Sequence, residues 1–128
     1  MKLTIKGKEY TPKFGIGFME RAIEAEQPEG QDIMKLSTQK LIFHSLAYAD
    51  ERQGLEVSLN QFDVYDFLDE IGLNDPLIKQ FQVEFFNSMR VHLPDEASKK
   101  AIDEVVKALT PADKKKVSKS GVKAGSKT

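Results

Sequence analysis

The sequence predicts a mainly α protein of the α+β class, with an N-terminal two-stranded β-hairpin packed on a compact bundle of four to five helices and a disordered basic C-terminal tail. Two observations predict this class. Apolar residues recur at helical spacing over most of the chain, and the first twelve residues alternate polar and apolar side chains around a glycine. The 128 residues suffice for one hydrophobic core. We therefore expect one domain over residues 1–109, including the hairpin at 1–12, and a tail over 110–128.

The hairpin is predicted to turn at Gly7–Lys8, because glycine readily takes the positive φ that a two-residue turn requires. In that register Ile5 faces Tyr10, and Leu3 lies on the same side of the hairpin. A lone hairpin is not stable in water, so this apolar side must pack on the helices. Pro12 lacks an amide hydrogen and ends the second strand or occupies a free edge.

Helical spacing predicts a first helix over Gly15–Glu26, which Pro28 and Gly30 stop. A second helix is expected over Thr38–Gln53, after a short turn at 33–36. Its apolar face is the widest in the chain, so we expect this helix to lie at the centre. The packing face of the first helix is expected to comprise Phe18, Met19, Ala22 and Ile23.

A third helix is predicted to begin at a capping box formed by Ser58 and Gln61 and to end near Gly72. Its packing face would be Val64, Phe67, Leu68 and Ile71. The aromatic residues of this helix and the next are interpreted as core rather than as a stacking platform. They are Phe62, Tyr65, Phe67, Phe81, Phe85 and Phe86.

The fourth helix has the clearest start signal, because Asn74 or Asp75 can cap it and Pro76 suits the first helical position. Pro94 ends that helix, and Asp95 is expected to cap a fifth. The fifth helix has a narrow apolar face made mostly of small residues: Ala101, Ile102, Val105, Val106 and Leu109.

Residues suited to catalysis or metal binding are few. The chain has no cysteine, and His44 and His92 fall on different predicted helices, so no set of metal ligands is apparent. We interpret His44 as an exposed surface histidine. Asp63, Asp66 and Glu70 share a helical stripe without the EF-hand pattern and are interpreted as a solvated face. These patterns predict a protein that is not an enzyme and holds no metal or cofactor.

Charge is distributed unevenly along the chain. Residues 110–128 hold six lysines and one aspartate, a net charge of +5, which leaves −6 for residues 1–109 out of the overall −1. The basic segment has no apolar residue larger than valine, so we expect it to be disordered. It leaves open a second function, a small regulatory or nucleic-acid-binding module that uses the basic tail. The acidic body and the absence of arginine from the tail argue against nucleic acid.

The opening MKLTIKGKEYTPKFGIGFMERA resembles the start of the tail assembly chaperones of long-tailed phages of Gram-positive hosts. Members of that family begin with a short "LTI-GK-Y" hairpin, followed by "KFG" and a helix. An acidic, helix-rich domain with a lysine-rich ending is also similar. The matching positions are Leu3, Thr4, Ile5, Gly7, Lys8, Tyr10, Lys13, Phe14 and Gly15.

The resemblance implies a protein of the host cytoplasm, absent from the mature virion, that binds the tape measure protein and keeps it soluble during tail assembly. It also implies a ribosomal frameshift that makes a longer form, which recruits the tail tube protein. The codons of Lys114–Lys116 are compatible with an A-rich slippery site. No membrane partner is expected, because the chain has neither a signal-peptide-like start nor an apolar run long enough to span a bilayer.

The fifth helix is the predicted contact with the partner, because its apolar face is the weakest internal anchor. The residues predicted to contact the partner are Ile102, Val105, Val106 and Leu109. The alternative is that this helix closes the core of its own domain. Covering a long partner with many copies also suggests a homo-oligomer.

Overall fold

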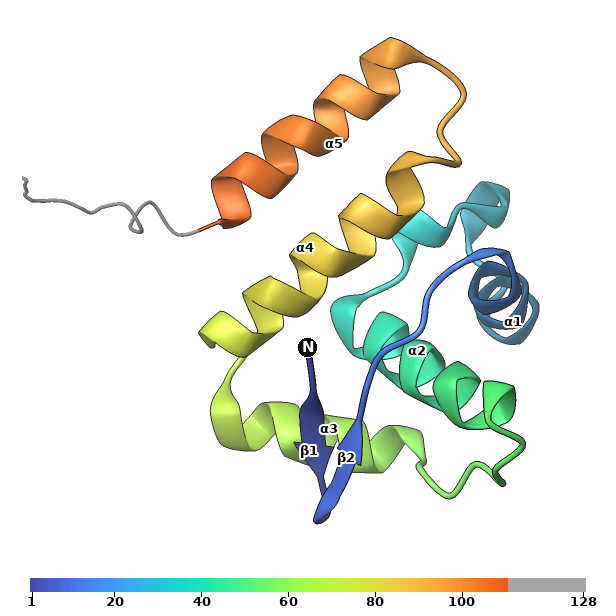
Figure 1. Cartoon of the computed structure of the whole chain (residues 1–128), viewed down its shortest axis with the longest axis vertical. Helices are drawn as coiled ribbons and strands as arrows, with labels where there is room; N and C mark the ends of the chain where they lie inside the picture. The colour runs from blue at the N-terminus through green and yellow to red at the C-terminus, as the bar shows by residue number, and fades with distance from the viewer. Residues whose placement is uncertain (111–128) are drawn as a thin grey trace, which may run out of the picture.

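The computed structural model describes residues 1–110 as a mainly α fold with one small β-hairpin (Figure 1). The predicted disordered tail, apart from Thr110, lies outside the described residues. Two strands precede five helices, with two short 3₁₀ helices, η1 and η2, between the first two. The elements are β1 (Leu3–Ile5), β2 (Lys8–Tyr10), α1 (Ile16–Glu26), η1 (Glu29–Gln31), η2 (Ile33–Lys35), α2 (Thr38–Arg52), α3 (Gln61–Ile71), α4 (Pro76–Arg90) and α5 (Glu96–Leu109).

The hairpin turns one residue earlier than predicted. Leu3 pairs with Tyr10 and Ile5 with Lys8, so the turn residues are Lys6 and Gly7 rather than Gly7 and Lys8. Both have positive φ, 52° and 78°, as a type I′ turn requires. The prediction required positive φ only of Gly7. The apolar side was predicted correctly, since Leu3, Ile5 and Tyr10 are all buried.

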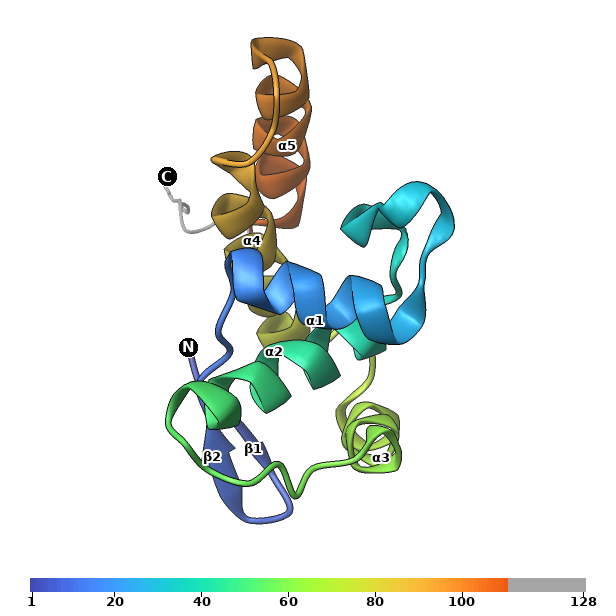
Figure 2. The same cartoon turned by 90° about the vertical axis from the view of Figure 1, so that its right-hand side faces the viewer.

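Helix α2 lies at the centre of the fold, as predicted. It packs on α1 and on α3, and eight of its fifteen residues are buried. Figure 2 shows α1 running along one side of α2, with the hairpin and α3 on the other side. A backbone hydrogen bond from Lys13 N–H to the carbonyl of Ser45, 3.1 Å long, ties the segment before α1 to the middle of α2.

Helix α3 begins two residues later than its predicted cap implied. Asn60, not Ser58, is the N-cap: its side chain accepts a hydrogen bond from the Asp63 amide, and the Asp63 carboxylate accepts one from the Asn60 amide, both 3.0 Å long. Asn60 and Asp63 therefore form the capping box, which the preference for serine or threonine in this motif obscured. The predicted packing face is confirmed, because Val64, Phe67 and Leu68 are buried and Ile71 packs against the core.

Helix α4 begins as predicted, with Asp75 accepting a hydrogen bond from the Leu77 amide and Pro76 in the first turn. Its aromatic residues meet the start of α1, since the rings of Phe14, Phe18, Phe81 and Phe85 pack with centroids 5.2 to 6.2 Å apart. The interpretation of the aromatic residues as core is wrong for Phe62, which is 73% exposed at the first turn of α3.

Helix α5 lies along α4 and away from the rest of the described fold (Figures 1 and 2). Its packing is almost entirely on α4. Asp95 caps it, as predicted, by accepting a hydrogen bond from the Ser98 amide at 2.7 Å. Arg90 at the end of α4 donates two hydrogen bonds to Asp103, at 2.9 and 3.1 Å, and this ion pair holds the pKa of the Asp103 carboxyl below its usual value. Helix α4 thus belongs to the core, and α5 is attached to its outer side.

Candidate partner-binding surface

The residues predicted to contact a partner share one face of α5 but differ in burial. Ile102 is buried against α4, where it anchors the helix. Val105 is 39% exposed, and Val106 and Leu109 are half-buried. One predicted contact residue therefore supports the fold, and the other three leave apolar surface open to water.

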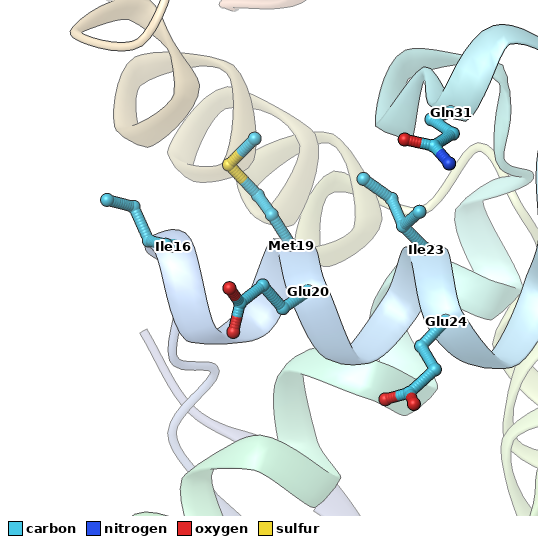
Figure 3. Close-up of a pocket in the computed structure, with 6 residues that line it drawn as sticks. All are labelled: Ile16, Met19, Glu20, Ile23, Glu24 and Gln31. Atoms are coloured by element: carbon cyan, nitrogen blue, oxygen red, sulfur yellow. The ribbon is translucent and has the colours of Figure 1, made fainter.

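A second apolar surface lies along α1. The predicted packing of Met19 and Ile23 on the core is confirmed, because both are half-buried against it, and their remaining surface borders a groove. Ile16, Met19 and Ile23 point to one side of the helix, opposite Gln31 of η1 (Figure 3). Together with the carboxylates of Glu20 and Glu24 they line an open groove with a volume of about 510 Å³. We call these six residues the α1 groove. A further hollow lined by Ile23, Glu24, Gln27, Pro28, Gly30 and Gln31 continues it.

The spacing of Ile16, Met19 and Ile23 is the signal that could have revealed this groove. These residues recur at i, i+3 and i+7, on a stripe beside that of the buried Phe18 and Ala22. The apolar arc of α1 is therefore wider than its contact with α2 requires. Ile16 had not been assigned to any face, and it is 63% exposed.

His44 is buried, not exposed as predicted from the polar side of its helix. It is 1% exposed and lies between two side chains of α1. Arg21 Nη1 donates to His44 Nδ1 at 2.6 Å, and His44 Nε2 donates to Glu26 at 2.8 Å. Because arginine can only donate, these contacts define a neutral imidazole with its proton on Nε2. The prediction failed because both partners belong to another helix, 23 and 18 residues earlier in the chain.

This cluster joins α1 to α2 by charged hydrogen bonds. Arg21 also donates to both oxygens of Glu51, at 3.1 and 3.2 Å, and Glu26 forms an ion pair with Lys40 at 2.8 Å. Burial lowers the pKa of His44, and the Arg21 cation adds to this effect against the opposing influence of Glu26. Burial raises the pKa of Glu26, but the hydrogen bonds from Lys40 and His44 outweigh it, so the net shift is downward. The enclosed imidazole offers no access to a substrate, and the cluster stabilises the contact between the two helices.

The acidic residues of α3 divide into two groups. Asp63 is buried in the capping box and pairs with Lys6 at the hairpin turn, so interpreting it as solvated is wrong. The Lys6 hydrogen bond is the largest influence that lowers the pKa of Asp63, and the Asn60 amide adds to it. Asp66 and Glu70 are exposed, as predicted. Residues 1–110 contain no cluster of three or more His, Asp or Glu side chains placed to hold a metal ion.

Comparisons with protein-family models, with curated proteins and with solved structures found no match to this chain. Across the part of the chain that the structure describes, no helix has the length and apolar character to cross a bilayer.

Proposed function

We propose that this protein is a tail assembly chaperone of a long-tailed phage, which binds the tape measure protein and keeps it soluble during tail assembly. In this proposal it acts without catalysis in the host cytoplasm and is absent from the finished virion. A longer form made by ribosomal frameshifting recruits the tail tube protein. The resemblance of residues 1–22 to that family supports the proposal, and the matching residues lie in the hairpin and in the segment that leads into α1.

The single observation that carries the proposal is the position of α5. This helix rests on one neighbour and keeps the apolar side chains of Val105, Val106 and Leu109 partly open to water. A tape measure protein is expected to be a long, amphipathic helical chain that exposes apolar stripes before the tube assembles. A helix with a partly open apolar face can cover such a stripe reversibly, because each contact gains about 25 cal/mol per Å² of apolar surface buried.

Co-expression with a tape measure fragment tests the proposal. The fragment should become soluble with the wild-type protein, and Val105→Asp should reduce its soluble fraction, because a charge would lie in the contact. Val91→Asp is the matched control, since Val91 is 74% exposed at the end of α4 and outside the α5 face. A fragment equally insoluble with and without the protein would contradict the proposal.

The frameshift has a separate test in the nucleotide sequence. We expect a slippery heptamer in the codons around Lys114–Lys116. Mass spectrometry of the expressed gene should then detect a longer product with the same N-terminal peptides. Codons without such a heptamer, or a single product, would count against the longer form.

A further inference from the structure

We infer that the α1 groove is a docking site for a cationic amphipathic helix of another polypeptide. The inference rests on the proposed function in one respect, that the helix belongs to the tape measure protein. The groove residues themselves determine the chemistry of the occupant: an apolar stripe flanked by lysine or arginine.

The floor of the groove suits a helix. Ile16, Met19 and Ile23 form a straight apolar row along α1, about 10 Å long at 1.5 Å per residue (Figure 3). A partner helix with apolar residues at i, i+4 and i+7 presents a row of the same length. Met19 lies in the middle, and its unbranched side chain adapts to partners of different shape.

The rim of the groove determines the charge of the occupant. Glu20 and Glu24 are exposed, lie one helical turn apart and belong to none of the ion pairs within residues 1–110. Two like charges at i and i+4 repel each other and destabilise the helix. A cation placed between the two carboxylates reduces this repulsion. Arg21 and Glu26 of the same helix, in contrast, are engaged by α2.

Gln31 closes the end of the groove with a polar group. It has φ 53°, a conformation that residues other than glycine seldom adopt, and it follows Gly30 at φ 67°. The backbone of η1 thus holds the Gln31 side chain opposite Ile23 (Figure 3). Its amide group can donate to, or accept from, the polar flank of a docked helix.

Two other occupants fit the groove less well. Helix α5 of a second copy carries Glu96, Asp103 and Glu104 along with its lysines, so it would bring carboxylates to a rim of carboxylates. Residues 111–128 are rich in lysine but have no apolar side chain larger than valine to fill the floor. A helix of another polypeptide that carries both an apolar stripe and flanking lysine or arginine can fill the apolar floor and pair with the carboxylates of the rim.

Binding of a model peptide tests the inference directly. The probe is a fluorescein-labelled helical peptide of about 18 residues, with leucine at i, i+4 and i+7 and lysine on both flanks, followed by fluorescence anisotropy. The wild-type protein should bind it, and should bind a peptide with glutamate in place of lysine much more weakly. Ile16→Ser should weaken binding, because it removes exposed apolar floor without disturbing the core.

Charge removal at the rim provides the matched comparison. Glu20→Gln with Glu24→Gln should weaken lysine-peptide binding about fivefold, the size expected for the loss of two surface ion pairs. Asp66→Asn with Glu70→Gln removes the same charge at the same spacing on α3 and should change binding less than about twofold. No binding of the lysine peptide, or equal losses in the two double variants, would overturn the inference.

The same variants separate this inference from the proposed function. If the wild-type protein solubilises the tape measure fragment but the Glu20 and Glu24 double variant does so equally well, the chaperone function stands and the groove is not its contact. If the fragment stays insoluble throughout while the lysine peptide binds as described, the groove is a docking site and the proposed function fails.

Discussion

The hydrogen bonds of His44 to Arg21 and Glu26 determine the protonation state of its imidazole. Arg21 can only donate to Nδ1, so protonation of that nitrogen would place two donors against each other. An unfolded chain takes up this proton near pH 6.5, whereas the folded protein, in which the pKa of His44 is lowered, takes it up only at lower pH. The unfolded state therefore binds more protons in that interval, and acid favours unfolding.

We predict that the free energy of unfolding falls as the pH is lowered from about 7 through the interval below 6.5. His44→Gln should flatten this dependence, because glutamine can accept from Arg21 and donate to Glu26 without titrating. Urea unfolding followed by circular dichroism at several pH values measures the effect. Asp63 and Asp103, whose pKa values are lowered from 3.8, act only in more acidic solution. If the free energy of unfolding depends on pH equally in the wild-type protein and in His44→Gln, His44 is not the titrating group.

Gly17 allows α1 to approach α2 closely. A Cβ atom on this residue would lie 2.7 Å from Cζ of Tyr48, well inside van der Waals contact. At a solvent-exposed position inside a helix, replacing glycine by alanine raises the free energy of unfolding by about 1 kcal/mol.

We predict the opposite sign for Gly17→Ala, a destabilisation of about 1–3 kcal/mol, because the added methyl group overpacks the contact with Tyr48. Chemical denaturation of the single variants and of the Gly17→Ala, Tyr48→Ala double variant measures this effect. The cost of the glycine substitution should shrink when the ring is absent. An unchanged cost in the Tyr48→Ala background would show that the ring is not its cause.

At the level of single elements, α3 depends on a cap that links it to the hairpin. The Asp63 carboxylate accepts a hydrogen bond from the Asn60 amide and also forms an ion pair with Lys6. One side chain therefore stabilises both the start of α3 and the turn of the hairpin. The N-cap side chain itself is provided by Asn60.

We predict that Asn60→Ala lowers the free energy of unfolding by about 1 kcal/mol, the usual cost of losing an N-cap side chain. Ser58→Ala should change it by less than about 0.5 kcal/mol, because Ser58 is exposed and precedes the cap. Urea unfolding of the two variants under identical conditions makes the comparison. A larger loss at Ser58 would instead favour the cap predicted from the sequence.

On the scale of the whole molecule, burial is unevenly shared among the helices. Helix α2 buries eight residues, whereas α5 buries Ile102 alone. Regions with few buried apolar contacts open more readily than the core. The pair of helices α4 and α5 thus combines a well-anchored partner with a weakly anchored one.

We predict that backbone amides in α5 exchange with solvent at least about tenfold faster than those in α2. Hydrogen exchange read by mass spectrometry or NMR measures both helices in one sample, with α2 as the internal reference. Ile102→Ala should accelerate exchange in α5 while leaving α2 unchanged. Protection of α5 as strong as that of α2 would argue that α5 is a fixed part of the core.

Much of this fold could be predicted from local patterns. Helix positions followed from apolar spacing, and the starts of α4 and α5 followed from Asp75 and Asp95, because an N-cap acts within its own turn. The cap of α3 was a local pattern that was assigned to the wrong residue, since Asn60 and Asp63 form the capping box within one turn. Other errors came from features that a local pattern does not contain. The hydrogen-bond partners of His44 lie in another helix. The register of the hairpin requires a positive φ at Lys6, which is uncommon for residues other than glycine.

The candidate site was predictable only in part. The apolar face of α5 is visible in the sequence, but which of its residues face α4 depends on how the helix is rotated about its axis. The α1 groove is the part of the α1 surface that packing against the rest of the fold leaves exposed. Met19 and Ile23 are half-buried against the core, as their spacing predicts, and only the three-dimensional structure shows that they also line a groove with the exposed Ile16.

The distribution of the four methionines has a practical consequence for spectroscopy. Met19 lies in the α1 groove, whereas Met89 lies in the core. Carbon-13 labelling of the methyl groups would therefore place one reporter where a ligand is expected to arrive and another where none can reach. A resonance that moves during titration beside one that stays still would locate the bound molecule in a single spectrum.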